Sequence, residues 1–327
     1  MSLALVTGGC GFVGRHLVET LRARGDDVRV LDTASPAGKG AAGVEWRRGS
    51  ILDAADLASA MQGVDCAYHL AGIAHLWTPD RSAFDRINRK GAEMVVRTAR
   101  TEGVRRVVHC STESILLPRR RKGGPIDESA PPALADMAGP YTRSKYLGEQ
   151  AALAAARNGM DVVVVNPTVP IGAGDRNMTP PAAMLALFLS GGSPFFLDCV
   201  LNLVDVRDLA KGIALAGERG RSGERYILGG ENVALRKLLP ELERLSGRRM
   251  PKHAVPSLLA LATGSISGFV ADRITKTPPV VTREGVALAL RSAPFDSRKA
   301  ERELGYAAAP IGRALTDAVE EFKRRPA

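Results

Sequence analysis

The amino-acid sequence predicts an α/β protein, with a doubly wound parallel sheet and a smaller, mainly helical C-terminal domain. In the first half of the chain, short valine-rich apolar runs alternate with longer segments of helical periodicity. This pattern is typical of parallel strands joined by crossover helices. A glycine-rich turn separates the first strand from the first helix. Beyond residue 170 the alternation weakens, so we expect a differently built second domain there.

Composition favours a globular protein that does not bind nucleic acid. The chain has 327 residues, of which 45% are hydrophobic and 24% are charged, as in ordinary globular proteins. The net charge of +10 could suggest nucleic acid as a partner. Only 5% of the residues are aromatic, however, and none alternates with basic residues to stack on bases.

The cysteines and the apolar runs indicate a reducing compartment. The four cysteines are far apart and show no C-x-x-C spacing, so we predict no metal site and no disulfide framework. The N-terminus leads directly into a strand without a signal-like segment. No run of 18 consecutive apolar residues exists, so no spanning helix is expected. We expect a cytoplasmic homodimer, with peripheral contact at the inner membrane surface as a further option.

The first turn predicts a dinucleotide site. After a β-rich run at residues 3–6, Gly8, Gly11 and Gly14 recur at three-residue intervals before a helical pattern begins. Glycine lets the backbone approach a pyrophosphate, and a helix N-terminus offers it free N–H groups and a positive dipole. A glycine triplet alone is weak. Its position between a strand and a helix is the context found in Rossmann folds.

The end of the second strand indicates the type of cofactor. This strand, residues 28–31, ends at Asp32. A carboxylate here accepts hydrogen bonds from the ribose hydroxyls of adenosine and repels a 2′-phosphate. We therefore predict NAD in preference to NADP. Arg47 and Arg48 could soften that preference.

Tyr141 and Lys145 are the candidate proton-transfer pair. On a helix, residues four apart lie on one face, about 6 Å apart at Cβ. A free tyrosine has a pKa of about 10, and a neighbouring ammonium favours the phenolate and lowers that pKa. Such a tyrosine can exchange a proton with an alcohol or ketone. The spacing alone is weak, because a solvated lysine on an amphipathic helix produces the same pattern. His69 and His109 lie within predicted strands and are interpreted as core histidines.

Several motifs occur in an order that identifies a family by resemblance. They are Thr7-Gly8-x-x-Gly11-Phe12-x-Gly14, Leu70-Ala71-Gly72, Asn88-x-x-Gly91, Ser111-Thr112, Tyr141-x-x-x-Lys145, Asn166-Pro167-Thr168-Val169, Leu203-Val204-Asp205 and Phe295-Asp296-Ser297. The chain resembles the extended short-chain dehydrogenase/reductases, the NAD-dependent epimerase/dehydratase superfamily. The resemblance covers nearly the whole chain.

The resemblance implies a role for each matching residue. Thr112 stands where the catalytic serine or threonine would be, Tyr141 is the acid/base, and Lys145 holds the ribose and tunes Tyr141. The implied cofactor-binding residues are Gly8, Gly11, Phe12, Val13, Gly14, Asp32, Ser50, Ile51, Leu70, Ala71, Gly72, Asn88, Ser111, Tyr141, Lys145, Pro167, Thr168 and Val169. Ser50 is a departure, since many relatives carry an aspartate there that contacts the adenine. The nearby Asp53 could take part in this contact, but we interpret it as a helix-start residue.

The sequence leaves alternatives for the substrate. In the sugar-converting relatives, arginines that hold a diphosphate commonly precede Leu203 and begin an Arg-x-Gly-Asp stretch. Here the first place reads Val200-Leu201-Asn202. At the second place Arg291 could substitute, but the Gly-Asp is missing. Residues 166–167 and 295–297 resemble dihydroflavonol reductases and 3β-hydroxysteroid dehydrogenases, and residues 134–141 and 226–232 resemble hopanoid-associated proteins labelled sugar epimerases.

We therefore expect an NAD-dependent oxidoreductase acting on the 3β-hydroxyl of a sterol-like or triterpenoid-like apolar alcohol, with C-4 decarboxylation as an optional further step. The alternative is a nucleotide-sugar epimerase or dehydratase. A non-catalytic NAD(P)-binding regulator fits less well, because it could have lost Thr112, Tyr141 and Lys145.

The second half of the chain gives the domain boundaries. We predict a cofactor domain at residues 1–175, to which residues 200–220 return through a strand at 200–206. Residues 176–199 and 221–327 form the substrate domain. Residues 254–271 carry no charge and could form a core helix, a substrate lid or a membrane-contacting patch. The basic run at 119–122 is interpreted as a solvated loop, with an anionic lipid or substrate contact as the alternative.

Overall fold

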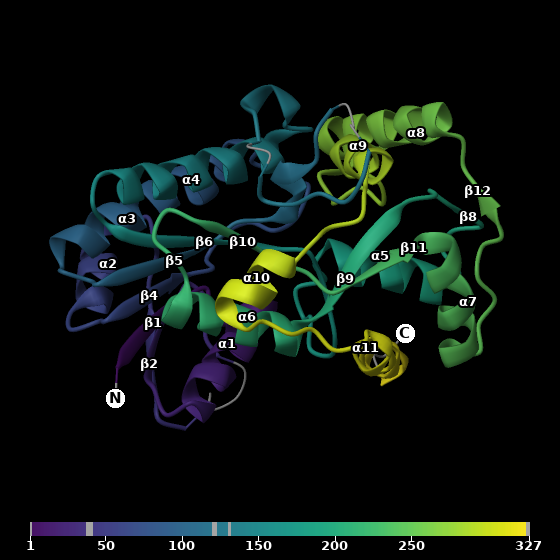
Figure 1. Cartoon of the computed structure of the whole chain (residues 1–327). Coiled ribbons are helices and arrows are strands. Elements are labelled where there is room, and N and C mark those ends of the chain that lie inside the picture. Colours follow the sequence, from purple (N-terminus) through teal and green to yellow (C-terminus); the bar gives the residue numbers. More distant parts are fainter. Residues whose placement is uncertain (1, 37–41, 120–122, 130–131, 325–327) are drawn as a thin grey trace.

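The structure, a computed structural model, describes residues 2–36, 42–119, 123–129 and 132–324. Most of the basic run at 119–122 lies outside the described residues. Figure 1 shows a central sheet between helices, with a second, mainly helical region beside it.

Seven parallel strands form the central sheet, in the order β10-β6-β5-β4-β1-β2-β3. The predicted doubly wound parallel sheet is therefore confirmed. The chain leaves β1 on one side toward β2 and on the other toward β4, so the switch point lies beside β1, where such sheets bind their ligands. The strands are β1 (Leu3–Thr7), β2 (Asp27–Asp32), β3 (Val44–Arg48), β4 (Cys66–His69), β5 (Arg106–Cys110), β6 (Asp161–Pro167) and β10 (Arg225–Leu228).

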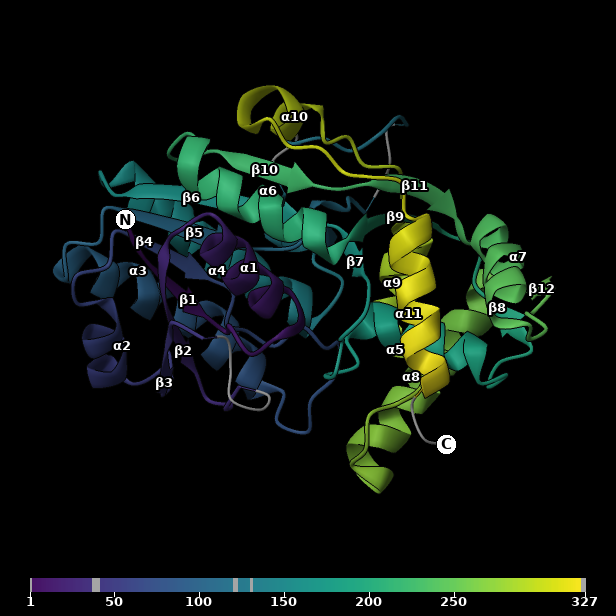
Figure 2. The same cartoon turned by 90° about the horizontal axis from the view of Figure 1, so that it is seen from below.

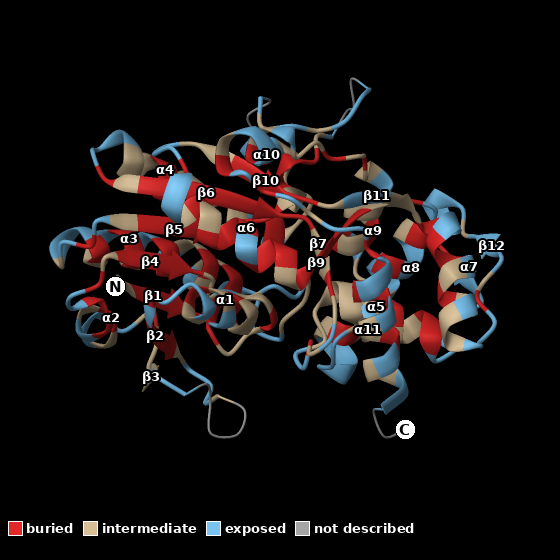
Figure 3. Ribbon diagram, turned by 60° about the horizontal axis from the view of Figure 1, so that its bottom comes forward, coloured by how far each residue is buried: buried red, intermediate tan, exposed pale blue. Residues whose placement is uncertain are grey.

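Helices cover both faces of this sheet, and Figure 3 shows the strands as a buried layer between them. Successive strand residues point to opposite faces, so Val6 of β1 packs into one apolar core and Leu5 into the other. The first core lies under α1 (Phe12–Ala23) and α6 (Val206–Arg219). The second lies under α2 (Ala54–Met61), α3 (Gly91–Thr101) and α4 (Pro140–Arg157).

A third apolar core belongs to the C-terminal half. A small sheet of order β11-β9-β7 forms one side of it. Two further short strands, β8 and β12, pair with each other. The strands are β7 (Val169–Ile171), β8 (Phe195–Phe196), β9 (Val200–Asp205), β11 (Glu231–Ala234) and β12 (His253–Ala254), and the helices are α5 (Pro180–Leu189), α7 (Leu235–Ser246), α8 (Ser257–Val270), α9 (Arg283–Arg291), α10 (Arg298–Leu304) and α11 (Gly312–Arg324). Short 3₁₀ and π segments are η1 (Phe84–Lys90), η2 (Glu113–Leu116), η3 (Leu134–Asp136) and η4 (Ala271–Thr275).

The edge strand of the large sheet differs from the prediction. The strand at 200–206 was expected to return to this sheet, but β9 pairs with β7 and β11 instead. β10 takes the place beside β6. Strands buried on both faces are almost continuously apolar. Tyr226, Ile227 and Leu228 of β10 are fully buried, whereas β9 is interrupted by Asn202. The element that does return to the sheet is α6. The domain boundaries stay a prediction.

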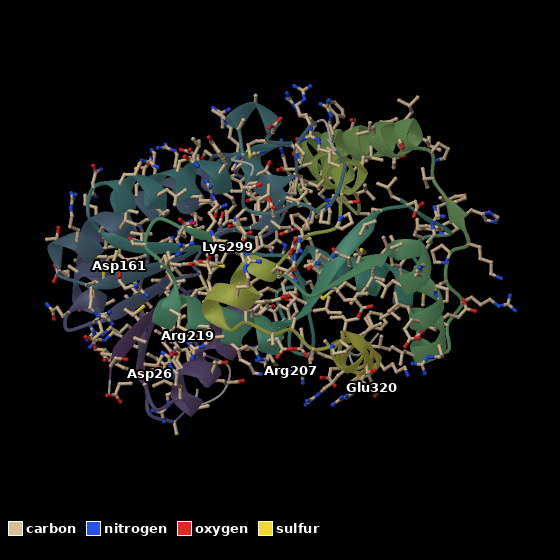
Figure 4. All side chains as sticks on the ribbon, in the orientation of Figure 1. Asp26, Asp161, Arg207, Arg219, Lys299 and Glu320 are labelled. Atoms are coloured by element: carbon tan, nitrogen blue, oxygen red, sulfur yellow. The ribbon has the colours of Figure 1, made fainter. Side chains whose placement is uncertain are left out.

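Lys299 of α10 fastens the C-terminal segment to this edge. Its Nζ donates to Glu224 Oε2 at 2.6 Å and to the Arg225 carbonyl at 2.8 Å, and it lies 4.8 Å from the centre of the Tyr226 ring (Figure 4).

Residues 254–271 do not form a core helix, so that alternative is wrong. Only Ala260 and Gly264 of α8 are buried, while Leu258 is 83% exposed. In the described part of the chain, no helix is both long and apolar enough to cross a membrane.

Candidate active site

The turn after β1 forms a tight backbone cradle at the start of α1. Gly8 has φ +76°, and a Cβ there would lie 2.7 Å from the Ala71 nitrogen. A Cβ on Gly14 would lie 2.1 Å from the Gly8 carbonyl oxygen. Gly11 is the N-cap of α1 and provides no side-chain hydrogen bond to the helix. The first N–H groups of α1, including those of Phe12 and Val13, therefore suit a pyrophosphate.

Asp32 lies directly beside this cradle. Its Oδ2 accepts from the Cys10 nitrogen and its Oδ1 from the Ala34 nitrogen, both at 2.9 Å. Burial, followed by the charge of Asp32, raises the pKa of the Cys10 thiol to about 11. A carboxylate has about four acceptor positions, so Asp32 keeps capacity for ribose hydroxyls.

The two arginines near Asp32 differ in what they contact. Arg47 donates from Nε to Glu45 at 2.6 Å and from Nη1 to the Ser59 hydroxyl at 2.6 Å. Arg48 is the register partner of Asp32 in the neighbouring strand. Of the two, Arg48 is therefore the one placed to soften a preference for NAD.

Ser50 and Ile51 follow β3 at the same edge of the sheet. The Ser50 hydroxyl accepts from the Leu52 nitrogen at 3.1 Å, and Ile51 is buried. Asp53 caps α2 by accepting from the nitrogens of Ala55 and Asp56. The interpretation of Asp53 as a helix-start residue is confirmed.

Asn88 connects the loop after β4 with α4. Its Oδ1 accepts from the Ile73 nitrogen at 2.8 Å, and its Nδ2 donates to the Ser144 hydroxyl at 3.0 Å. Asn88 is buried, and a Cβ on Gly72 would lie 2.9 Å from its Oδ1. Leu70 and Ala71 donate to the Thr7 carbonyl and hydroxyl respectively. Asn88 thus holds the part of α4 that lies between Tyr141 and Lys145.

Thr112, Tyr141 and Lys145 meet at the end of β5. Tyr141 is buried in the first turn of α4, and its side chain lies beside that of Thr112. Lys145 Nζ donates to the Cys110 carbonyl at 2.7 Å. Asn166, at the end of β6, donates from Nδ2 to the Thr112 carbonyl at 3.1 Å. Two hydroxyls and an ammonium therefore lie at the end of β5.

The pKa of Tyr141 differs from the prediction. Lys145 was expected to lower it, but burial raises it, because a buried phenolate loses its hydration. The neighbouring Thr112 hydroxyl opposes this rise, while the charges of Glu113 and Glu284 add to it. Burial also lowers the pKa of Lys145.

The remaining predicted residues lie at the ends of β5 and β6. The Ser111 nitrogen donates to the Val165 carbonyl at 2.8 Å, and its buried hydroxyl has no hydrogen-bond partner among the described residues. The Thr168 nitrogen donates to the Leu228 carbonyl at 3.2 Å. Pro167 ends β6, and Val169 begins β7.

The histidines at these strand ends are buried in the core, as interpreted. His69 Nδ1 lies 2.8 Å from the Thr7 hydroxyl, and its ring centre is 5.3 Å from that of His109. Burial lowers the pKa of His69 to about 3 and that of His109 well below its ordinary value. Neither ring is suited to exchange protons at neutral pH.

Glu284 of α9 was missed in the sequence. Its buried carboxylate accepts from the Tyr141 nitrogen at 3.2 Å, the Thr142 nitrogen at 2.8 Å and the Thr142 hydroxyl at 2.8 Å. A Cβ on Gly139 would lie 2.4 Å from Glu284 Oε2. The only sequence signal is a helix that begins at Pro140, after Gly139, without a capping side chain, which requires a remote acceptor.

Glu113 and Glu149 were also missed. Glu113 accepts from the Thr112 hydroxyl at 3.0 Å, and burial raises its pKa to about 7. Glu149 is fully buried, pairs with Arg225 and accepts from Asn166 Nδ2 at 2.9 Å. Glu113 brings an ionisable group to the Thr112–Tyr141 pair, and Glu149 fixes the asparagine that holds Thr112.

Comparison with known proteins identifies relatives over most of the chain. Residues 4–229 match the NAD dependent epimerase/dehydratase family. A Synechocystis protein with a provisional dihydroflavonol 4-reductase name is 37% identical over 97% of this chain and 94% of its own. Sterol demethylase protein B of Methylococcus capsulatus is 29% identical over 98% of each chain. The crystal structure of gox2253 superposes with a TM-score of 0.86 at 34% identity, covering 99% of this chain and 98% of that one.

The raised pKa of Glu113 predicts a pH dependence of stability. A glutamate ordinarily has a pKa of 4.5, against about 7 in this folded protein. Between these values the folded state binds the proton more tightly than the unfolded chain. The free energy of unfolding therefore falls as pH rises through this window. Glu113→Gln should remove this fall, which is worth at most about 3 kcal/mol.

Urea unfolding of both proteins at pH 5, 6, 7 and 8 measures the difference. Replacing an exposed glutamate, Glu231→Gln, is the control and should leave the dependence unchanged. If Glu113→Gln loses stability with rising pH as steeply as the parent, the pKa of Glu113 is not raised in the folded protein.

Proposed function

The chain belongs to the NAD-dependent epimerase/dehydratase family, and from this premise we propose that it is a dehydrogenase that oxidises the 3β-hydroxyl of a sterol-like apolar alcohol. The observation that carries the proposal is the grouping of Thr112, Tyr141 and Lys145 at the carboxyl edge of the parallel sheet, with Lys145 Nζ donating to the Cys110 carbonyl. When bound, NAD⁺ supplies the hydride acceptor and a positive charge at this edge.

Tyr141 is proposed to carry the proton. Burial keeps its phenol protonated in the ligand-free protein, so it acts as a base only when additional positive charge lies beside it. Thr112 holds the substrate oxygen. Its single hydroxyl hydrogen, which donates to Glu113 in the ligand-free protein, would turn to that oxygen as negative charge develops there. Lys145 lies one helical turn from Tyr141, and at the proposed site its ammonium binds ribose hydroxyls. Glu284 holds the backbone from which Tyr141 projects.

The cofactor residues are proposed on the geometry of the loop. The glycine cradle and the start of α1 would hold the pyrophosphate, and Asp32 the adenosine ribose. Ser50 and Ile51 would line the adenine. Ser111, Pro167, Thr168 and Val169 would lie near the nicotinamide.

Two positions disfavour a sugar nucleotide as the substrate. Asn202 is buried, donates to the Asn232 side chain at 2.8 Å and accepts from the Gly230 nitrogen at 2.8 Å. It is therefore part of the protein framework. Arg291 donates from Nη1 to the Asp136 carbonyl at 2.5 Å, so that N–H is engaged within the protein. Neither position offers the free bidentate cation that holds a diphosphate well.

An apolar alcohol is supported by a relative's name and by the surface near the site. One relative is named sterol demethylase protein B. The uncharged helix α8 packs against α9, the helix that carries Glu284. If the substrate carries a neighbouring C-4 carboxylate, oxidation creates a β-keto acid, which loses carbon dioxide with little further catalysis.

Glu113 favours a second candidate function. A nucleotide-sugar dehydratase must protonate a departing hydroxyl, and a carboxyl with a pKa near 7 next to Thr112 suits that task. We keep this as the alternative, since the diphosphate-binding arginines are replaced or engaged.

The substrate proposal is tested by incubating the protein with NAD⁺ and a panel of 3β-hydroxysterols, C-4 carboxylated members included. NADH absorbance should rise with one or more of them. Tyr141→Phe should lower kcat by about a hundredfold or more, as expected for loss of the proton-transfer group, and leave NAD⁺ affinity nearly unchanged. Tyr146→Phe on the same helix is the control and should retain activity. If no sterol in the panel raises NADH absorbance and a UDP-sugar is turned over, the sterol assignment is refuted in favour of the alternative.

The cofactor proposal is tested by measuring Kd for NAD⁺ and NADP⁺ by calorimetry. Asp32→Ala should reduce the preference for NAD⁺, because it removes both the ribose acceptor and the charge that repels a 2′-phosphate. Arg48→Ala should shift the preference the other way. If the unaltered protein binds NADP⁺ more tightly than NAD⁺, the proposed role of Asp32 is wrong.

Glu284→Gln tests whether the cap positions Tyr141. A glutamine amide has one acceptor oxygen, whereas the two oxygens of the glutamate carboxylate together accept three hydrogen bonds. The free energy of unfolding should therefore fall by about 1–2 kcal/mol. The kcat for the alcohol should fall as well, at saturating NAD⁺. Asp53→Ala removes the cap of the remote helix α2 and should cost similar stability without lowering kcat. Equal kcat values for Glu284→Gln and Asp53→Ala would reduce Glu284 to a stabilising role.

A further inference from the structure

We propose that the outer face of α8 docks on the surface of an anionic lipid bilayer. This face, called the α8 face below, consists of Leu258, Leu259, Ile266 and Phe269, with Ile274 in the η4 segment that follows. Their exposed fractions are 83%, 58%, 66%, 62% and 69% respectively. Figure 2 shows this part of the chain projecting away from the sheet and its flanking helices. Binding to lipid requires no substrate, so this inference stands apart from the proposed reaction.

The α8 face has the geometry of an interfacial helix. At 100° per residue, the four α8 side chains fall within an arc of roughly 100°. The buried residues Ala260 and Gly264 lie on the opposite side, and a Cβ on Gly264 would lie 3.1 Å from the backbone of Arg283. One side of α8 is therefore packed on α9, and the other side presents aliphatic and aromatic side chains to the surroundings.

Two of the polar side chains of α8 already have hydrogen-bond partners within the helix. The Thr263 hydroxyl donates to the Leu259 carbonyl at 2.9 Å, and the Ser265 hydroxyl donates to the Leu261 carbonyl at 2.8 Å. A hydroxyl that is already hydrogen-bonded costs much less to remove from water than a free one. The helix itself contains no charged residue.

Positive charges flank the α8 face on both sides. Lys252 precedes the helix, and Arg273 and Lys276 follow it, all exposed. Within residues 252–283 the single acidic residue is Asp272, which is paired with Arg81 and accepts from Trp77 Nε1 at 2.9 Å. An apolar strip bordered by lysine and arginine is the pattern of helices that lie in the headgroup region of anionic membranes.

The lipid surface explains this face better than a membrane span does. The helix has 14 residues, whereas about 20 are needed to cross the hydrocarbon core. A bilayer surface covers an apolar strip and attracts its basic border at the same time. The docked face would also lie next to α9, whose Glu284 contacts the helix of Tyr141, so an apolar molecule leaving the membrane would arrive near the site.

Vesicle co-sedimentation tests the proposal with the full chain. Binding should be strong to vesicles of phosphatidylcholine that contain about 30% of the anionic lipid phosphatidylglycerol. It should be weaker to pure phosphatidylcholine and should fall as salt rises. Leu258→Ser/Phe269→Ser should lower the association constant by about tenfold or more, since even one leucine-sized side chain buried in hydrocarbon contributes about that factor.

Two control variants make the test specific. Leu134→Ser, at an apolar position that is 37% exposed and remote in sequence from the α8 face, should bind like the parent. Lys252→Gln/Lys276→Gln should weaken binding to the anionic vesicles by about fivefold per charge. Lys211→Gln/Lys323→Gln removes the same charge from α6 and α11 and should have a much smaller effect. Circular dichroism should show all four variants folded, because the altered side chains are largely exposed.

Two results would overturn the proposal. One is the absence of binding to the anionic vesicles at low salt, or equal binding by the parent and Leu258→Ser/Phe269→Ser. The other is a dimer of the parent that this double variant dissociates, with no vesicle binding by either protein. The α8 face would then be a contact between two copies of the chain.

Discussion

The carboxylate of Glu284 holds the first turn of α4, and much of the proposed chemistry depends on that contact. Helix α4 begins at Pro140 with Gly139 as its N-cap, so its first N–H groups have no side-chain acceptor at the cap. Glu284, more than a hundred residues further along the chain, accepts from two of those groups and from the Thr142 hydroxyl. Burial raises the pKa of this carboxyl, and the three hydrogen bonds lower it. The contact fixes Tyr141 and also fixes where α9, and with it α8, lies.

The parallel sheet supplies the second constraint, because its carboxyl ends meet at one edge. Each important side chain or turn comes from a different strand end: the glycine turn after β1, Asp32 at the end of β2, Thr112 after β5 and Asn166 in β6. Buried polar contacts then fix their positions. Asn166 holds Thr112, and Glu149 with Arg225 holds Asn166. An arrangement assembled from rigid elements suits a reaction that needs two hydroxyls in one orientation.

Local patterns were enough to predict the fold and the family. The glycine turn, the strand ending at Asp32 and the Tyr141–Lys145 spacing each depend on neighbouring residues, and the family resemblance drawn from such motifs is confirmed. Contacts between distant segments were not predictable in the same way. Glu284 has no local signal, and the exchange of β9 for β10 at the sheet edge depends on which strand is buried on both faces. The sign of the pKa shift at Tyr141 depends on burial, which the spacing does not report. The exposure of α8 was likewise decided by packing, since an uncharged run fits a core helix equally well.

We propose that this site removes a hydride and a proton from an alcohol and releases the oxidised product. A deuterium label in the alcohol distinguishes this reaction from the alternatives. With a 3β-hydroxysterol deuterated at C-3, we predict that deuterium appears in the released NADH and that turnover slows by a primary isotope effect. An epimerase or dehydratase would instead return the label to its substrate. If a sugar nucleotide is turned over, and no deuterium passes from the sterol to the cofactor, the site does not oxidise sterols.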